Sequence, residues 1–131
     1  MENIITGKNI VKTFGTGNEQ VKALDSVDAE VKRGEFVAVM GPSGSGKTTL
    51  LHTLSGMDSI TSGSVKFKDA ELSGLSENAL ADVRRTKMGF IFQQPTMLKN
   101  LNLLDNIILP AAWGGRRASV KLMHKAKDLM K

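Results

Sequence analysis

A single eight-residue stretch constrains the fold of this chain more than any other feature. It reads Gly41-Pro42-Ser43-Gly44-Ser45-Gly46-Lys47-Thr48. Residues 36–40, just before it, are continuously apolar, as is typical of a short strand covered on both faces of a parallel sheet. After it, leucines recur at helical spacing and Gly56 is a natural stop, so we expect a helix that ends near Met57. The predicted local order is strand, glycine loop, helix.

A loop of this composition is suited to binding phosphate. Glycines let the backbone wrap an anion with its amides pointing inward and no Cβ in the way. Lys47 would supply charge to the β- and γ-phosphates, Thr48 a hydroxyl for Mg²⁺, and Thr49 a contact to the α-phosphate. A chance match occurs about once in two hundred chains of this size. The predicted cofactor is MgATP, and the loop residues predicted to bind it are Ser43, Gly44, Ser45, Gly46, Lys47, Thr48 and Thr49.

Composition narrows the class of protein. The chain has 131 residues, enough for one domain, and no cysteine, which excludes disulfides and thiolate metal sites. It has no apolar run of about 20 residues and no secretory signal at its start, so we expect a cytoplasmic location. The net charge of +5 leaves nucleic acid open as a partner. Because the basic residues are scattered and lack interleaved aromatics, we favour solvated helix faces and regard nucleic acid as an unlikely partner.

The rest of the chain alternates between strand and helix patterns. Residues 4–14, 27–31 and 64–67 alternate apolar with polar side chains, which predicts antiparallel strands. Residues 90–92 form a second candidate for a buried strand, with Gln93 at its end. A helix should begin after Ser76, with Leu75 and Leu80 at the positions of a hydrophobic staple, and close before Gly89.

Two further helices are predicted in the last third of the chain. Residues 101–109 suggest a short helix stopped by Pro110. From Ser119 onward apolar residues lie on one helical face, yet the sequence stops at Lys131 with no capping residue. We therefore expect the chain to be the N-terminal portion of a longer protein.

Three stretches carry a resemblance to a known family. They are residues 21–24 (VKAL), residues 34–51 (GEFVAVMGPSGSGKTTLL) and residues 88–94 (MGFIFQQ). Together they resemble the ATPase subunit of ATP-binding cassette (ABC) transporters, in the branch of lipoprotein-release, macrolide-export and antimicrobial-peptide-export ATPases. The resemblance covers essentially the whole chain.

This resemblance implies an α/β fold, the P-loop NTPase core of an ABC ATPase with an N-terminal antiparallel β-subdomain. Residues 1–131 would form a single partial domain. Residues 1–35 and 59–75 would be the β-subdomain, residues 36–58 and 76–94 the nucleotide-binding core, and residues 95–131 the start of the helical subdomain. The family also implies ATP hydrolysis coupled to transport, a transmembrane permease partner, a homodimer of the full-length ATPase, and a peripheral location at the inner face of the cell membrane.

Two site residues follow from the resemblance. Phe14 would stack on the adenine, a position where the family usually has tyrosine; the alternative is a core residue at the end of a strand. Gln93 would contact Mg²⁺ or the attacking water and connect the ATP site to the membrane partner; the alternative is an ordinary turn glutamine. The implied catalytic residues are therefore Lys47 and Gln93, and the implied metal contacts are Thr48 and Gln93.

The chain also departs from the family. Leu103 and Asp105-Asn106 stand where relatives often have threonine and Glu-Asn, which bears on partner docking. The Leu-Ser-Gly-Gly-Gln signature, the apolar strand ending in Asp-Glu and the switch histidine are missing; His52 and His124 are interpreted as surface or packing residues.

We therefore expect the fragment to bind ATP better than it hydrolyses it. Without a neighbouring parallel strand, residues 36–40 would expose apolar surface and favour self-association. Two alternative functions remain at this point. One is a non-transport ABC-type ATPase acting on nucleic acid or the ribosome, and the other is a nucleotide-binding module without turnover.

Overall fold

The computed structural model describes residues 2–94, 96–112 and 119–130, with the side chain of Ala112 excluded. The chain separates into two compact units, which divide between Met88 and Gly89. No helix in the described residues is both long and apolar enough to cross a membrane.

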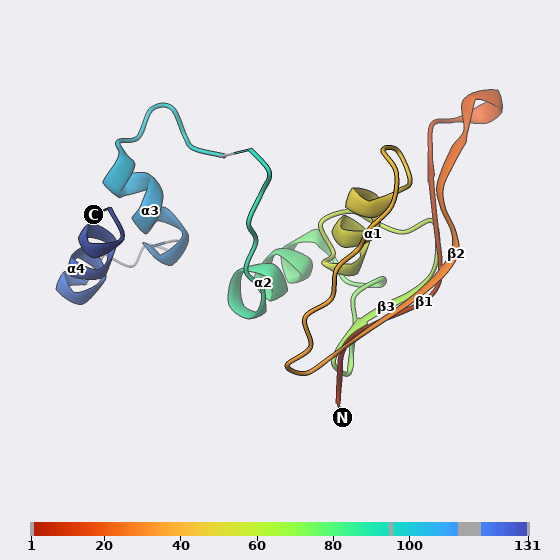
Figure 1. Ribbon diagram of the computed structural model, residues 1–131, viewed down its shortest axis with the longest axis horizontal. Helices are drawn as coiled ribbons and strands as arrows, with labels where there is room; N and C mark the ends of the chain where they lie inside the picture. The colour runs from red at the N-terminus through yellow and green to blue at the C-terminus, as the bar shows by residue number, and fades with distance from the viewer. Residues whose placement is uncertain (1, 95, 113–118, 131) are drawn as a thin grey trace. The chain divides into compact units, whose positions relative to one another are not determined.

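The first unit is built on an antiparallel sheet (Figure 1). Strands β1 (Asn3–Phe14) and β2 (Val21–Lys32) form a long hairpin whose tip holds the short 3₁₀ helix η1 (Gly17–Glu19). Strand β3 (Ser62–Phe67) pairs with the other edge of β1, and β4 (Ala70–Glu71) pairs with β3, giving the order β2-β1-β3-β4. The three strands predicted from alternation are confirmed.

A bulge in β1 determines which of its side chains face the core. Between Gly7 and Ile10, β1 gains one residue relative to both neighbouring strands, and Asn9 adopts a left-handed φ of 48°. The carboxylate of Asp28 accepts a hydrogen bond from the Asn9 backbone N–H at 2.7 Å, which holds this conformation. Gly7 and Ile10 are both buried although they are three residues apart. The strand therefore resumes its alternation with Ile10 and Lys12 on the buried side.

Helix α1 (Lys47–Leu54) packs against the sheet and ends where the sequence predicts. Gly56 has a φ of 67°, its N–H donates to the Thr53 carbonyl, and the Met57 N–H donates to the His52 carbonyl at 2.9 Å. These two bonds form a Schellman motif, which requires a residue with positive φ and so favours glycine. The buried core between the helix and the sheet consists of Ile10, Leu24, Leu54, Val65 and Leu72.

Helix α2 (Glu77–Lys87) also begins and ends as predicted. The Ser76 hydroxyl accepts a hydrogen bond from the Ala79 N–H at 3.4 Å and caps the first turn. On the inner face of α2, the Arg84 guanidinium donates to the Gly56 carbonyl and pairs with Glu77. Arg84 thus ties α2 to the turn that ends α1.

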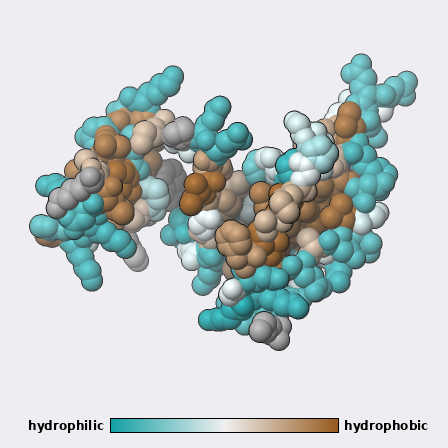
Figure 2. All heavy atoms as spheres, viewed as in Figure 1, coloured by the Kyte–Doolittle hydropathy of each residue, from teal (hydrophilic) through white to brown (hydrophobic). Residues whose placement is uncertain are grey.

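The two predicted buried strands are wrong in the described structure. Residues 36–40 and 90–92 are not part of any sheet, and the exposed fractions of Phe36, Met40 and Ile91 are 96%, 88% and 104%. A strand inside a parallel sheet needs neighbouring strands to bond its backbone, and none of the described strands pairs with either segment. The apolar pattern of these two segments indicates that their side chains favour burial, but it does not provide a neighbouring strand with which they could pair. Figure 2 shows that brown, hydrophobic residues are present at the visible surface of the molecule.

The second unit contains helices α3 (Leu103–Ala112) and α4 (Val120–Leu129), which contact each other. The side-chain amide of Asn106 bonds the backbone of the preceding loop, including both the N–H and the carbonyl of Leu98. Pro110 does not stop α3, which corrects the sequence prediction. Proline at position 110 removes one backbone donor from the helix, and α3 nevertheless continues to Ala112. The Ser119 hydroxyl accepts a hydrogen bond from the Leu122 N–H at 3.2 Å and caps α4, which begins where the helical pattern predicts. Lys131 lies outside the described residues.

Candidate nucleotide-binding site

The glycine loop lies between the extended residues 36–40 and the first turn of α1. Gly44 and Gly46 have φ values of 77° and 84°, in the left-handed region that favours glycine. Gly46 also lies against β2, where a Cβ added to it would be 2.6 Å from the Ala23 carbonyl oxygen. The loop is therefore held close to the sheet by backbone contact, and only glycine fits at Gly46.

The Lys47 side chain folds back across the loop. Its ammonium donates to the Pro42 carbonyl at 2.6 Å and lies 3.3 Å from the Ser45 hydroxyl. Both partners are neutral, so the lysine charge is not compensated by either of them. An anion in the loop could therefore replace these contacts with stronger, charge-assisted ones.

The start of α1 adds a second source of positive potential. The first bond within the helix runs from the Leu50 N–H to the Gly46 carbonyl at 2.8 Å. The preceding amides of Lys47, Thr48 and Thr49 have no partner inside the helix, as at every helix N-terminus. Aligned amides, a lysine and left-handed glycines in one short segment fit a phosphate chain.

A cavity of about 280 Å³ adjoins the loop. Part of its wall is formed by the loop residues Gly41, Pro42, Ser45, Gly46 and Lys47, and the rest by the apolar side chains of Leu24, Val27, Val39, Met40 and Leu50. Apolar walls do not compensate the desolvation of a charged phosphate. We infer that this cavity underlies the loop and does not hold the anion.

Phe14 lies at the end of β1, opposite Val21 of β2. The exposed fraction of Phe14 is 45%, so the interpretation of Phe14 as a fully packed core residue is not supported. The Lys12 ammonium lies 4.9 Å from the centre of the phenyl ring. Strand β2 passes Phe14 at Val21 and the glycine loop at Ala23, which places the ring and the loop near the same stretch of β2.

The remaining predicted residues are distributed unevenly. Ser43, Gly44, Ser45 and Thr48 are exposed in the loop, and Thr49 is half-buried. Gln93 is exposed in the second unit, so its approach to the phosphate loop stays a prediction. His52 is half-buried and His124 exposed, consistent with the surface or packing roles expected of them.

Sequence reasoning missed Lys12. A lysine in an alternating strand usually faces water, but Lys12 is 7% exposed. One signal was available: Lys12 stands two residues after Ile10 and two before Phe14, so all three share one face of the strand.

The fold and the loop define a P-loop nucleotide-binding protein. Over residues 24–131 the sequence matches the ABC transporter family, and the chain belongs to that family. The family resemblance drawn from the sequence is thereby confirmed.

The chain is similar to several export and release proteins. It is 44% identical over 125 residues to the bacitracin export ATP-binding protein BceA of Halalkalibacterium halodurans, covering 95% of this chain and 47% of that protein. It is 38% identical over 131 residues to the lipoprotein-releasing system ATP-binding protein LolD of Cytophaga hutchinsonii, covering 100% and 58%. It therefore spans about half the length of these relatives.

Solved structures confirm the fold class. The structure is similar to a dimeric post-hydrolysis state of the ATP-binding cassette MJ0796 bound to ADP and Pi, with a TM-score of 0.86 and 36% identity. The similarity covers 95% of this chain and 54% of that one. A second dimeric structure of the same cassette gives a TM-score of 0.84 at 39% identity, covering 92% of this chain and 53% of that one.

Proposed function

We propose that this chain binds MgATP in the loop of residues 41–48 and belongs to an ATPase subunit that powers export or extraction of a substrate by a membrane partner. The observation that carries the proposal is the loop itself. Gly46 is fixed against the Ala23 carbonyl, Lys47 spans the loop with an uncompensated charge, and α1 begins at the same point. Aligned amides and a lysine gathered in this way fit an anion such as a phosphate chain.

Each loop residue has a defined task in this proposal. The backbone amides from Ser43 to Gly46 bind phosphate oxygens, and Lys47 offsets charge on the β- and γ-phosphates. Thr48 donates its hydroxyl oxygen to Mg²⁺, and Thr49 contacts the α-phosphate. Bound Mg²⁺ would neutralise charge that develops on the phosphates during transfer. In this proposal Thr48, Gln93 and the nucleotide would hold Mg²⁺, whose preferred ligands are oxygen atoms.

The wider function is inferred from the names of the proteins to which the chain is similar. BceA and LolD carry export and release in their names, and the macrolide export relative MacB of Chlorobaculum tepidum is an ATP-binding/permease protein, 40% identical over 123 residues. We infer a transmembrane permease partner for this chain, pairing with a second ATPase copy, and a location at the inner face of the membrane. Phe14 would stack on the adenine, and Gln93 would link the nucleotide to the partner.

Calorimetric titration of the 131-residue chain with MgATP tests the site. Lys47→Ala should weaken binding at least about tenfold, because a charge-assisted contact of roughly 1.5–3 kcal/mol is lost. Lys87→Ala, which removes an exposed lysine from the last turn of α2, is the matched control and should leave the affinity unchanged. Binding that survives in Lys47→Ala would overturn the assigned site.

A further inference from the structure

Lys12 is a buried cation whose ammonium has an ion-pair partner and hydrogen-bond acceptors. Its side chain is 9% exposed, and its ammonium bonds the Asp58 carboxylate at 2.7 Å and the Ser59 carbonyl at 2.6 Å. The Ser59 hydroxyl lies 3.5 Å away. An ammonium has three donors in all, so these contacts fix its direction as well as its position.

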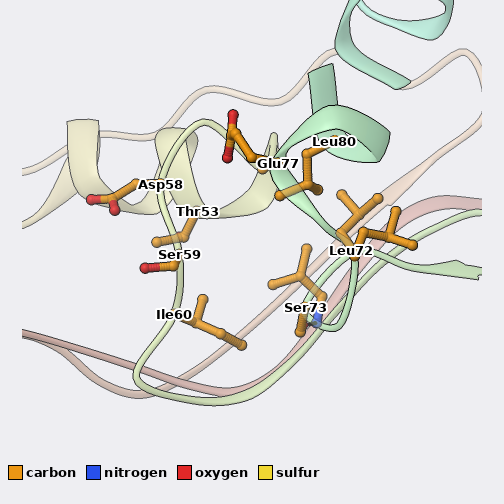
Figure 3. A pocket seen from close by; sticks show the side chains of 11 residues that line it. Thr53, Asp58, Ser59, Ile60, Leu72, Ser73, Glu77 and Leu80 are labelled. Carbon is orange, nitrogen blue, oxygen red and sulfur yellow. Dashed lines mark hydrogen bonds between the residues drawn. The ribbon is translucent and has the colours of Figure 1, made fainter. Parts of the chain in front are cut away.

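The partners of Lys12 belong to the turn that follows α1. The N–H groups of Met57 and Asp58 both donate to the His52 carbonyl in the last turn of the helix. Figure 3 shows Asp58 and Ser59 at one end of a cavity of about 170 Å³, with Leu72 and Leu80 at the other. Lys12 therefore joins strand β1 to the carboxyl end of the helix whose amino end carries the phosphate loop.

Backbone bonds reinforce this junction. The Thr61 N–H donates to the Val11 carbonyl at 2.8 Å, and the Thr13 N–H donates to the Thr61 hydroxyl at 3.0 Å. The last residues of β1 are thus bound to the segment after α1 on both sides of Lys12. These bonds set the direction of the next side chain of β1 on this face, which is Phe14.

The ammonium also lies over Phe14, 4.9 Å from the ring centre. Lys12 and Phe14 are two residues apart on one strand and so share a face. A cation over one face of a phenyl ring is attracted to its π electrons, which holds the ring in place and draws electron density away from the opposite face. An electron-rich base stacks more favourably on a ring polarised in this way.

We propose that Lys12 is a positioning residue for base binding, which fixes and polarises the Phe14 ring against which the adenine stacks. This inference rests on the proposed function, since it takes Phe14 as the adenine platform. Lys12 itself touches neither the base nor the phosphates. Its ion pair with Asp58 supplies the anchoring that keeps the ammonium over the ring.

The test separates base binding from phosphate binding. Magnesium tripolyphosphate carries the phosphate chain without the base, so calorimetry with MgATP and with magnesium tripolyphosphate reports the two contributions. Lys12→Met keeps the length of the side chain but removes its charge. It should weaken MgATP binding roughly three- to tenfold and change tripolyphosphate binding less than about twofold. Phe14→Leu should do the same, and the double variant should lose no more than Phe14→Leu alone.

Two outcomes overturn the proposal about Lys12. One is an equal loss for both ligands in Lys12→Met, which would mean a purely structural role. The other is unchanged MgATP binding in Lys12→Met while Phe14→Leu weakens it.

Asp58→Asn serves as the second variant should Lys12→Met fail to fold, because it loosens the ammonium without removing it, and the same selective loss is expected. If Phe14→Leu leaves MgATP binding intact, the adenine platform itself is wrong; if Lys47→Ala leaves tripolyphosphate binding intact, the phosphate site is wrong.

Discussion

Gly46 and Ala23 approach each other so closely that a Cβ on Gly46 would lie 2.6 Å from the Ala23 carbonyl oxygen. The contact joins the phosphate loop to β2 through backbone atoms alone. Gly46→Ala should therefore destabilise the first unit by about 2–3 kcal/mol, since the alanine is strained at a φ of 84° and also displaces a carbonyl. Urea unfolding followed by circular dichroism measures this loss.

Gly44→Ala is the control for that prediction. Gly44 has a similar φ of 77°, but nothing lies within 4 Å of the position its Cβ would take. Its substitution should cost only the left-handed strain, about 1 kcal/mol. Equal losses in the two variants would contradict the close packing of the loop on β2.

Arg84 should matter more to stability than its neighbour Arg85. The Arg84 side chain is 19% exposed and donates to the Gly56 carbonyl, whereas that of Arg85 is 49% exposed and pairs with Asp82 of its own helix. Arg84→Met should lower the free energy of unfolding by about 1.5–3 kcal/mol, the range for hydrogen bonds to charged groups. Arg85→Met should change it by less than about 0.5 kcal/mol. Chemical denaturation of both variants measures the two losses in free energy of unfolding. A larger loss in Arg85→Met than in Arg84→Met would contradict the stabilising contact between Arg84 and the turn that ends α1.

Glu71 should make the first unit sensitive to acid. Partial burial acts to raise the pKa of its carboxyl, but hydrogen bonds from the Ser73 side chain and from the Val65 and Ser73 backbone lower it below the ordinary value. A folded-state pKa below the unfolded one contributes stability that is present above the unfolded pKa and lost as the pH falls through the folded pKa. The Val65 N–H donates to Glu71 at 3.0 Å, so protonation weakens the β3–β4 corner.

Unfolding curves between pH 7 and about pH 3 would show this effect. Glu71→Gln should be less stable than the unsubstituted chain at pH 7, and the difference should shrink toward acid pH. Glu19→Gln, at the exposed tip of the β1–β2 hairpin, is the control and should show no such trend. A difference that stays constant with pH would exclude the Glu71 hydrogen bonds as its cause.

The exposed residues 36–40 should promote association between copies of the 131-residue chain. Phe36 and Met40 are 96% and 88% exposed. They belong to one apolar segment, and exposed apolar residues that are grouped favour association more than single ones do. The double substitution Phe36→Ser and Met40→Ser should lower the weight-average mass found by sedimentation velocity at high concentration. Leu129→Ser, which removes a 71% exposed residue from α4, should lower it much less. Masses that do not depend on either substitution would place the contact elsewhere.

Local chemistry was predictable from the sequence, and long-range pairing was not. The Ser76 cap, the Gly56 stop and the alternation of β1 depend on residues within one or two turns of each other, so the sequence contains their causes. The strands at residues 36–40 and 90–92 depend on neighbours that an apolar run does not specify, and there the prediction is wrong.

The site divides in the same way. The phosphate loop is a contiguous motif, and its strained glycines lie where the pattern places them. The junction of Lys12 and Asp58 joins residues 46 positions apart, and the pattern of β1 alone gives no indication of it. Gln93 depends on how the chain folds beyond the first unit, and its role stays a prediction.

The bulge at Asn9 has a consequence for comparing this chain with its relatives. Because β1 carries one extra residue there, Gly7 and Ile10 both face the core although they are three positions apart. Deletion of Asn9 would leave Gly7 and Ile10 two positions apart, which restores the regular alternation of the strand and keeps Lys12 and Phe14 on the side they now hold. Among relatives, a difference of one residue between Gly7 and Ile10 can therefore be absorbed by the gain or loss of this bulge, and the side chains of Lys12 and Phe14 keep their face of the strand.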